Sequence, residues 1–288
     1  MKINDTLNLI STITMTDGPL VTSQGTGFYY SRLGTTEDGE EPQWRKIEDM
    51  WLVTNRHVVI PKKEEIELAP ARLKFCLRKL GPSGALDWDS VALSAGELET
   101  LAKFHPDNSV DVAVVNIYEA VTNRIKSSDQ YAAPYLLHSD NFAGKNNIEV
   151  EASSDILVVG YPRGFYDDVN LFPIVKSGII ASRWGVGFRD QPYFLIDAKL
   201  FPGSSGSVVL SKPIDLVVKD GRVMLANEKQ FAFLGVYSGE YKLQETPVVI
   251  GDLTITQSSG LDLGIVWYAD LVEEIIDKGI PLSQALIP

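Results

Sequence analysis

The segment Gly203-Ser204-Ser205-Gly206 places two serines between glycines, and a serine hydroxyl is a candidate nucleophile. Glycine lets the backbone turn sharply, so this segment can present the hydroxyl of Ser205 to a substrate. The turn also leaves the amides of Gly203 and Ser205 free to face one pocket as an oxyanion hole, where each donor contributes about 3 kcal/mol. Taken alone, the segment is also consistent with an ordinary turn between strands.

A serine nucleophile needs a base, and the chain has three histidines. His57 follows closely after a predicted strand at residues 51–54, which places it in a short turn at the end of that strand. His105 precedes a proline in a loop, and His138 lies in a polar stretch rich in Gly and Asn. The sequence therefore favours His57 as the base, with a purely structural histidine as the alternative.

The base must be held in its productive tautomer by a carboxylate. Asp111 stands at the start of the apolar run at residues 112–115, where a half-buried carboxylate needs a partner. Asp107 lies four residues earlier in a loop and is the weaker candidate. The order His57, Asp111, Ser205 is one of the orders in which Ser-His-Asp triads occur. We therefore predict these three residues as a catalytic triad.

The blocks around the triad resemble the trypsin-like serine peptidases of the chymotrypsin fold, in particular the branch of HtrA/Deg proteases and glutamyl endopeptidases. The resemblance is carried by LVTNRHVV at residues 52–59, DVAVV at 111–115 and GSSGS at 203–207, together with GTGF at 25–28 and GYP at 160–162. It extends as scattered blocks over roughly residues 8 to 277. Two positions depart from the family pattern, because Ser204 stands where Asn or Asp is common and Val208 where Pro is common.

The resemblance implies an all-β fold, a chymotrypsin-like double β-barrel with a C-terminal helix. Residues 1–288 would form a single peptidase domain. Its N-terminal barrel would span residues 1–137 and carry His57 and Asp111, and its C-terminal part would span residues 138–288 and carry Ser205. Two observations agree with this fold. Short runs of β-branched and aromatic residues recur through both halves, and apolar residues at helical spacing follow Asp270.

The function implied is that of a serine endopeptidase, which hydrolyses peptide bonds in protein substrates without a metal or an organic cofactor. Ser205 would attack, His57 would transfer the proton, Asp111 would orient His57, and the amides of Gly203 and Ser205 would bind the oxyanion. The alternative is a catalytically silent pseudoprotease, which keeps the trypsin fold as a module that binds a peptide or a partner.

The pocket for the residue before the scissile bond (P1) is expected to lie beside the nucleophile. In this fold its walls come from the residues just before the serine and from a later strand. The candidates are Lys199, Leu200, Phe201, Tyr237, Ser238 and Gly239. Residues 196–202 hold no acid at the position where trypsins carry one, so we do not expect basic P1 residues. A solvated Lys199 favours an apolar P1, and a Lys199 that faces the pocket would favour an acidic one.

Composition limits the partners and the compartment. Asp and Glu number 38 and Lys and Arg 26, so the net charge is −12 and a nucleic-acid partner is not expected. No uncharged apolar run reaches the ~18 residues of a membrane helix, so no membrane partner is expected either. The lone cysteine, Cys76, and a start without an apolar signal segment lead us to expect a cytoplasmic protein. A protein that activates or inhibits such an unsecreted protease is an open alternative partner.

Overall fold

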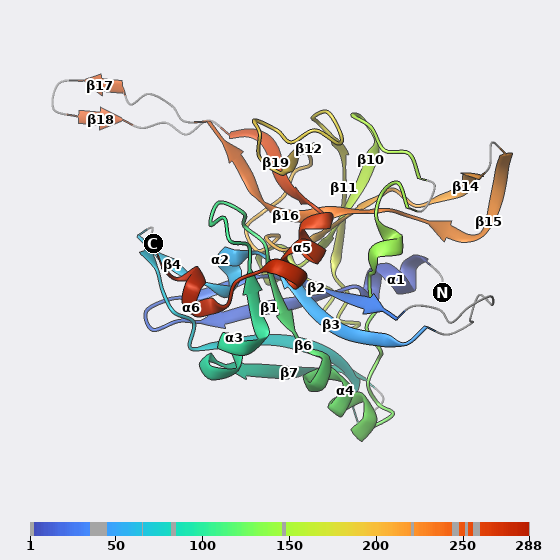
Figure 1. Ribbon diagram of the computed structural model, residues 1–288, viewed down its shortest axis with the longest axis horizontal. Helices are drawn as coiled ribbons and strands as arrows, with labels where there is room; N and C mark the ends of the chain where they lie inside the picture. Colours follow the sequence, from blue (N-terminus) through green and yellow to red (C-terminus); the bar gives the residue numbers. More distant parts are fainter. Residues whose placement is uncertain are drawn as a thin grey trace.

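The computed structural model describes residues 3–34, 45–64, 66–81, 85–145, 148–219, 222–243, 248–250, 253–255 and 260–287. Within these residues the chain forms two β units that pack against each other (Figure 1). The strand predicted at residues 51–54 is present, since β-branched and aromatic side chains pack well on a pleated surface. In the described part of the chain, no helix combines the length and the apolar character needed to cross a bilayer.

The first unit is an antiparallel sheet of seven strands in the order β7-β6-β1-β2-β3-β9-β8. Its strands are β1 (Ser11–Asp17), β2 (Thr22–Leu33), β3 (Ile47–Thr54), β6 (Arg72–Leu80), β7 (Leu86–Ser94), β8 (Ala102–Phe104) and β9 (Ala113–Asn116). Helices α1 (Ile3–Leu9), α2 (Arg56–Val59), α3 (Ala95–Leu101) and α4 (Tyr118–Ser127) and a small hairpin, β4 (Lys62–Lys63) and β5 (Ile66–Glu67), accompany the sheet. Leu52, Phe75 and Phe104 are fully buried in the core of this unit.

The second unit is a closed antiparallel barrel in the order β10-β11-β12-β19-β16-β13. Its strands are β10 (Asp155–Gly160), β11 (Ile174–Ile180), β12 (Tyr193–Asp197), β13 (Val208–Ser211), β16 (Phe233–Lys242) and β19 (Gly260–Tyr268). Two hairpins, β14 (Ile214–Lys219) with β15 (Arg222–Gln230) and β17 (Val248–Ile250) with β18 (Leu253–Ile255), extend from opposite sides of the barrel (Figure 1). The interior of the barrel buries Ile156, Phe194 and Val266.

A shared apolar core joins the two units. Phe28 of β2 and Phe233 of β16 meet edge to face with their ring centres 5.3 Å apart. Helix α5 (Asp270–Lys278) follows the barrel and packs Leu271 and Ile275 into the same core. Complete burial of one such side chain stabilises the fold by roughly 1.5–3 kcal/mol, so this core fixes the two units against each other.

The predicted fold class is confirmed, an all-β chymotrypsin-like fold with a helix after the second barrel. One detail differs from a pair of closed barrels. Among the described strands, hydrogen bonds close the ring in the second unit, whereas β7 and β8 remain the edges of the first sheet. The division at residues 137 and 138 stays a prediction.

A buried ion pair anchors the short helix that carries His57. The Arg56 side chain is only 4% exposed and lies against the carboxylate of Glu67, with Nη2 2.8 Å from Oε2. The same nitrogen donates to the carbonyl of Ala285 in α6 (Leu282–Ala285), at 2.5 Å. Burial raises the pKa of Glu67, but the hydrogen bonds and charge of Arg56 outweigh it, so the net shift is downward. The segment near the C-terminus therefore braces helix α2.

We expect Glu67→Gln to lower the free energy of unfolding by about 2 kcal/mol, because it leaves the Arg56 guanidinium buried without its counter-charge. Urea unfolding at neutral pH measures the loss. The control is Lys62→Gln. Lys62 contacts the same carboxylate from a more exposed position, so its replacement should change the free energy of unfolding by less than about 0.5 kcal/mol. The lowered pKa means that this stabilisation is present above pH 4.5 and declines as the pH falls below it. Equal effects of the two substitutions would contradict the assignment.

Candidate active site

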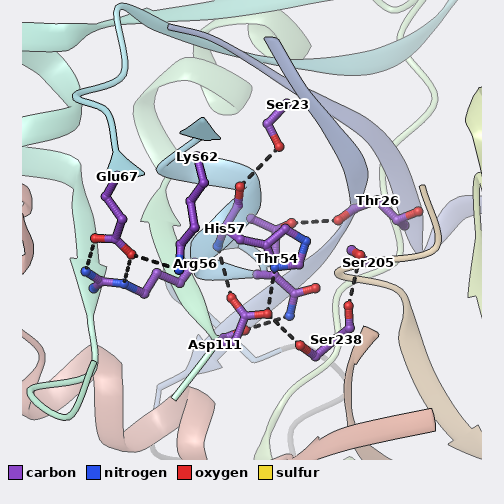
Figure 2. A network of polar contacts seen from close by, with 11 residues as sticks. Ser23, Thr26, Thr54, Arg56, His57, Lys62, Glu67, Asp111, Ser205 and Ser238 are labelled. Atoms are coloured by element: carbon purple, nitrogen blue, oxygen red, sulfur yellow. Dashed lines mark hydrogen bonds and ion pairs between the residues drawn. The ribbon is translucent and has the colours of Figure 1, made fainter. Parts of the chain in front are cut away.

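The neighbouring strands β3 and β9 bring His57 and Asp111 together. Thr54 at the end of β3 pairs with Ala113 at the start of β9, so the residues just beyond these ends lie side by side. Asp111 accepts from His57 twice, from the backbone amide at 2.9 Å and from Nδ1 at 2.7 Å (Figure 2). The side-chain amide of Asn55 donates to the Asp111 carbonyl at 2.6 Å and fixes this turn.

The contact with Asp111 determines how the His57 ring can act. A carboxylate accepts hydrogen bonds, so Nδ1 carries the proton and Nε2 is left as an acceptor. The His57 side chain is 37% exposed and that of Asp111 is 22% exposed, so one edge of the ring remains accessible. This arrangement can take a proton from a hydroxyl and hold the resulting imidazolium beside a negative charge.

Ser238 connects the acid to the predicted nucleophile. Its hydroxyl donates to Asp111 Oδ2 at 2.5 Å, and its carbonyl accepts from Ser205 Oγ at 2.9 Å (Figure 2). Strand β16 pairs with β13 in the barrel and so places Ser238 beside the nucleophile loop. The Tyr237 amide donates to the Ser207 carbonyl at this point. The chain of hydrogen bonds thus runs from Ser205 through Ser238 to Asp111, and Ser205 Oγ donates to this carbonyl rather than to the His57 ring.

The glycines on either side of the nucleophile are required by the backbone. Gly203 and Gly206 have φ values of +88° and +82°, a region that other residues rarely adopt. A Cβ on Gly206 would lie 2.0 Å from the Thr26 carbonyl oxygen, and a Cβ on Gly203 would lie 2.6 Å from the Arg163 amide nitrogen. The loop can therefore keep this shape only with glycine at both positions.

The amides of Gly203 and Ser205 are the candidate donors of an oxyanion hole. The Pro202 carbonyl accepts from the Arg163 amide at 2.6 Å, and because the peptide bond is trans, the Gly203 N–H points away from Arg163. Across the part of the chain that the structure describes, neither amide donates to a protein acceptor. Two unused donors beside a serine hydroxyl can bind an anionic oxygen.

Thr26 of the first unit holds the nucleophile loop of the second. Its amide donates to the Ser205 carbonyl at 2.8 Å, and its hydroxyl donates to the Gly203 carbonyl at 3.0 Å. Its own carbonyl accepts at 2.7 Å from the hydroxyl of Thr54, which lies three residues before His57. One residue therefore ties the loop that carries Ser205 to the strand that precedes His57.

The other candidates from the sequence lie elsewhere. His105 accepts from the Asp107 amide and lies 3.9 Å from Glu274, and Asp107 itself accepts from the Ser109 amide in an exposed loop. His138 lies 3.5 Å from Asp140, and burial lowers its pKa. Neither histidine takes part in the hydrogen bonds around Asp111.

A small cavity of about 170 Å³ lies beside the nucleophile loop. Four of the six predicted P1 residues line it, Lys199, Leu200, Phe201 and Tyr237. Ser238 and Gly239 do not line it, and Ser238 instead belongs to the hydrogen-bond chain described above.

Other residues of this cavity were not predicted from the sequence. Glu240 and Asp262 both line it and are exposed, as Lys199 is, so its rim carries two acids and one base. Burial raises the pKa of Tyr237 to about 12, which keeps its phenol neutral at the wall. Position 262 follows the nucleophile by more than fifty residues, and only the barrel topology brings it here.

We expect Ser238→Ala to lower kcat by roughly ten- to a hundredfold, since it removes a hydrogen bond to the charged carboxylate that orients His57, a contact worth about 1.5–3 kcal/mol. The assay is peptide hydrolysis at saturating substrate. Ser238→Thr keeps a hydroxyl and should recover much of the rate. An unchanged kcat in Ser238→Ala would show that the hydroxyl does not support Asp111.

Comparison with known proteins assigns the family. A profile of the trypsin-like peptidase domain matches residues 25–217. Among solved structures, the active form of the Rv3671c protease from M. tuberculosis gives a TM-score of 0.48 at 16% identity, covering 96% of this chain and 82% of that chain. The serine endoprotease from Yersinia pestis gives 0.44 at 14% identity, covering 96% and 66%. The HtrA-type protease AlgW with a decapeptide gives 0.42 at 13% identity, covering 96% and 67%. Curated protein sequences yield no match.

A closed antiparallel barrel packed on a second β unit, with a paired histidine and aspartate at their junction, defines the chymotrypsin-like class. The family match extends over more than half of the chain. The chain belongs to the trypsin-like peptidase family, as its sequence blocks predicted, and this membership supports a serine protease.

Proposed function

We propose that this protein is an endopeptidase that cleaves protein substrates through Ser205, His57 and Asp111. The observation that carries the proposal is the hydrogen bond of His57 Nδ1 to Asp111, whose carboxylate also accepts from the hydroxyl of Ser238, the residue whose carbonyl contacts Ser205. The two free amides at Gly203 and Ser205 support it independently, because an acyl-transfer site needs such donors.

The first half of the reaction forms an acyl-enzyme. Ser205 Oγ leaves the Ser238 carbonyl by rotation about Cα–Cβ and turns to Nε2 of His57, a change between staggered rotamers. His57 takes the hydroxyl proton while Oγ attacks the scissile carbonyl carbon. The amides of Gly203 and Ser205 bind the oxygen that becomes negative, and Asp111 stabilises the imidazolium. His57 then gives the proton to the leaving amine, and the C–N bond breaks.

The second half restores the enzyme. Water enters where the amine has left, and His57 takes one of its protons as the oxygen attacks the acyl carbon. The bond to Ser205 Oγ breaks, and the proton on His57 returns to that oxygen. Carboxylate product departs, and no metal or organic cofactor enters either half.

The P1 residue that fits best is small to medium and apolar. The proposed pocket is small, and buried Tyr237 forms part of its wall. The rim acids Glu240 and Asp262 repel an acidic P1 side chain, and exposed Lys199 is solvated.

In matched peptides that differ only at P1, we expect kcat/KM for Val, Leu or Ala to exceed that for Asp or Glu by about tenfold or more, since burial of an unpaired carboxylate is costly. Lys199→Ala is the control and should keep the apolar preference. A preference for Glu that disappears in Lys199→Ala would show that Lys199 faces the pocket. Strong cleavage after Arg would mean that Glu240 and Asp262 act as counter-charges.

A second candidate is a catalytically silent module that binds a peptide or protein. The contact of Ser205 Oγ with the Ser238 carbonyl favours it, because the hydroxyl is turned away from the base. The same contact suits a resting protease that a bound substrate or an activating partner would realign. A serine-reactive phosphonate separates the two functions, since labelling of the wild type and not of Ser205→Ala requires an assembled site. No labelling with or without peptide would favour the silent module.

A further inference from the structure

A second and larger cavity lies on the barrel beside the nucleophile loop. Its volume is about 860 Å³. It is lined by Pro162, Arg163 and Phe165, which lie in and just after the 3₁₀ turn η2 (Pro162–Gly164), by Val175 and Lys176 of β11, and by Phe201. None of these residues takes part in the proposed proton transfer.

Three large apolar side chains of the lining are exposed to solvent. Phe165 is 68% exposed, Val175 40% and Phe201 39%. Single exposed apolar side chains are common on proteins, but a group of them around one cavity marks a surface that another molecule covers. The cavity is therefore suited to a peptide chain with apolar side chains.

Two cations face the same cavity. Lys176 Nζ lies 4.7 Å from the centre of the Phe201 ring, and Arg163 Cζ lies 5.7 Å from it. Among the described residues, neither cation has a carboxylate within ion-pair distance. Asp167, two residues after Phe165 in the sequence, accepts from the side chain and the amide of Asn170. In a chain with a net charge of −12, two unpaired cations at one cavity are complementary to an acidic ligand.

The place of this cavity relative to Ser205 indicates which part of a substrate it meets. Phe201 lines both this cavity and the small P1 cavity and so separates them. The Arg163 amide is bonded to the Pro202 carbonyl, next to Gly203. The peptide residues before the scissile bond and those after it extend from that bond in opposite directions. If P1 fills the small cavity, the residues after the scissile bond lead toward the larger one.

We propose that the cavity between Arg163, Lys176 and Phe201 binds an acidic side chain within the first three residues after the scissile bond. Apolar neighbours of that acid pack on Phe165 and Val175. The assignment rests on the proposed function for the direction of the peptide, whereas the affinity for an acidic peptide follows from the cavity itself.

The test has a cleavage arm and a binding arm. Internally quenched peptides share one apolar P1 residue and carry Glu, Gln or Lys in turn at each of the three following positions. Wild type, Lys176→Gln and Arg163→Asn are compared, and Lys212→Gln is the control because Lys212 is an exposed lysine paired with Asp155. In the binding arm, the Ser205→Ala protein, with and without Lys176→Gln, binds the same fluorescent peptides uncleaved, and anisotropy gives Kd.

We expect Glu to exceed Gln by about tenfold in kcat/KM at one position, the difference to fall to about twofold or less in Lys176→Gln, and Lys212→Gln to behave as wild type. Cleavage with equal rates for Glu and Gln at all three positions would overturn the proposal. If no peptide is cleaved, the proposed function fails and the binding arm decides. A tenfold tighter Kd for Glu that Lys176→Gln removes supports the acid site, and equal Kd values overturn it.

Discussion

Replacement of Ser205 by alanine is expected to lower kcat for peptide hydrolysis by about 10⁶-fold, because the acyl-enzyme cannot form and only binding and the oxyanion donors remain. The substitution removes one oxygen whose protein partner is a carbonyl, so the fold should be unaffected. Hydrolysis of an internally quenched peptide under single-turnover conditions measures the loss of activity. Thermal unfolding of the same protein checks that the fold is intact.

Two neighbouring serines provide matched controls for this prediction. Ser204 is 2% exposed and Ser207 is 1% exposed, and the buried Ser207 hydroxyl has no protein partner within the described residues. Ser204→Ala and Ser207→Ala should therefore keep most of the activity. A loss in either control as large as that in Ser205→Ala would place the nucleophile elsewhere in the loop.

Replacement of Asp111 by asparagine is expected to lower kcat by about 10⁴-fold, the effect of the wrong histidine tautomer in a triad of this kind. Asp111 accepts from the His57 amide, from His57 Nδ1 and from the Ser238 hydroxyl. An amide side chain has one acceptor oxygen and two N–H donors, so it cannot satisfy all three. The measurement is kcat at saturating peptide.

Asp107→Asn is the control for Asp111→Asn. Asp107 accepts from the Ser109 amide, which lowers its pKa, and lies four residues away in an exposed loop. Its replacement should leave kcat within about twofold, as is usual for a surface substitution away from the site. If Asp107→Asn caused the large loss and Asp111→Asn the small one, the loop carboxylate would be the orienting acid.

Local sequence patterns were enough to predict the fold class and the pairing of His57 with Asp111. The strand predicted at residues 51–54 lies beside the apolar run that follows Asp111, so the polar residues at the ends of these two segments come together. The glycines around Ser205 predicted a sharp turn, and both adopt positive φ. In each case the physical cause lies within a few residues of the side chain concerned.

Features that depend on distant pairing could not be predicted. The sequence predicted Ser238 as part of the P1 pocket but not the bond from its hydroxyl to Asp111, because the position of β16 along β13 decides where that hydroxyl points. Glu240 and Asp262 reach the small cavity through barrel closure. Thr26 belongs to the block GTGF at residues 25–28. Its bonds to Gly203 and Ser205 link the first unit to the second, so the local sequence did not predict them.

Covalent attack by Ser205 is the central step of the proposed reaction, and acyl-enzyme trapping tests it directly. Wild type is mixed with a p-nitrophenyl ester of an apolar N-acyl amino acid, quenched in acid within the burst phase, and analysed by peptide mass spectrometry. We predict a burst of about one p-nitrophenolate per chain and one acyl group on Ser205. Neither the burst nor the adduct should occur in Ser205→Ala. Turnover with the acyl group on another residue, or turnover with no adduct and no burst, would contradict covalent attack by Ser205.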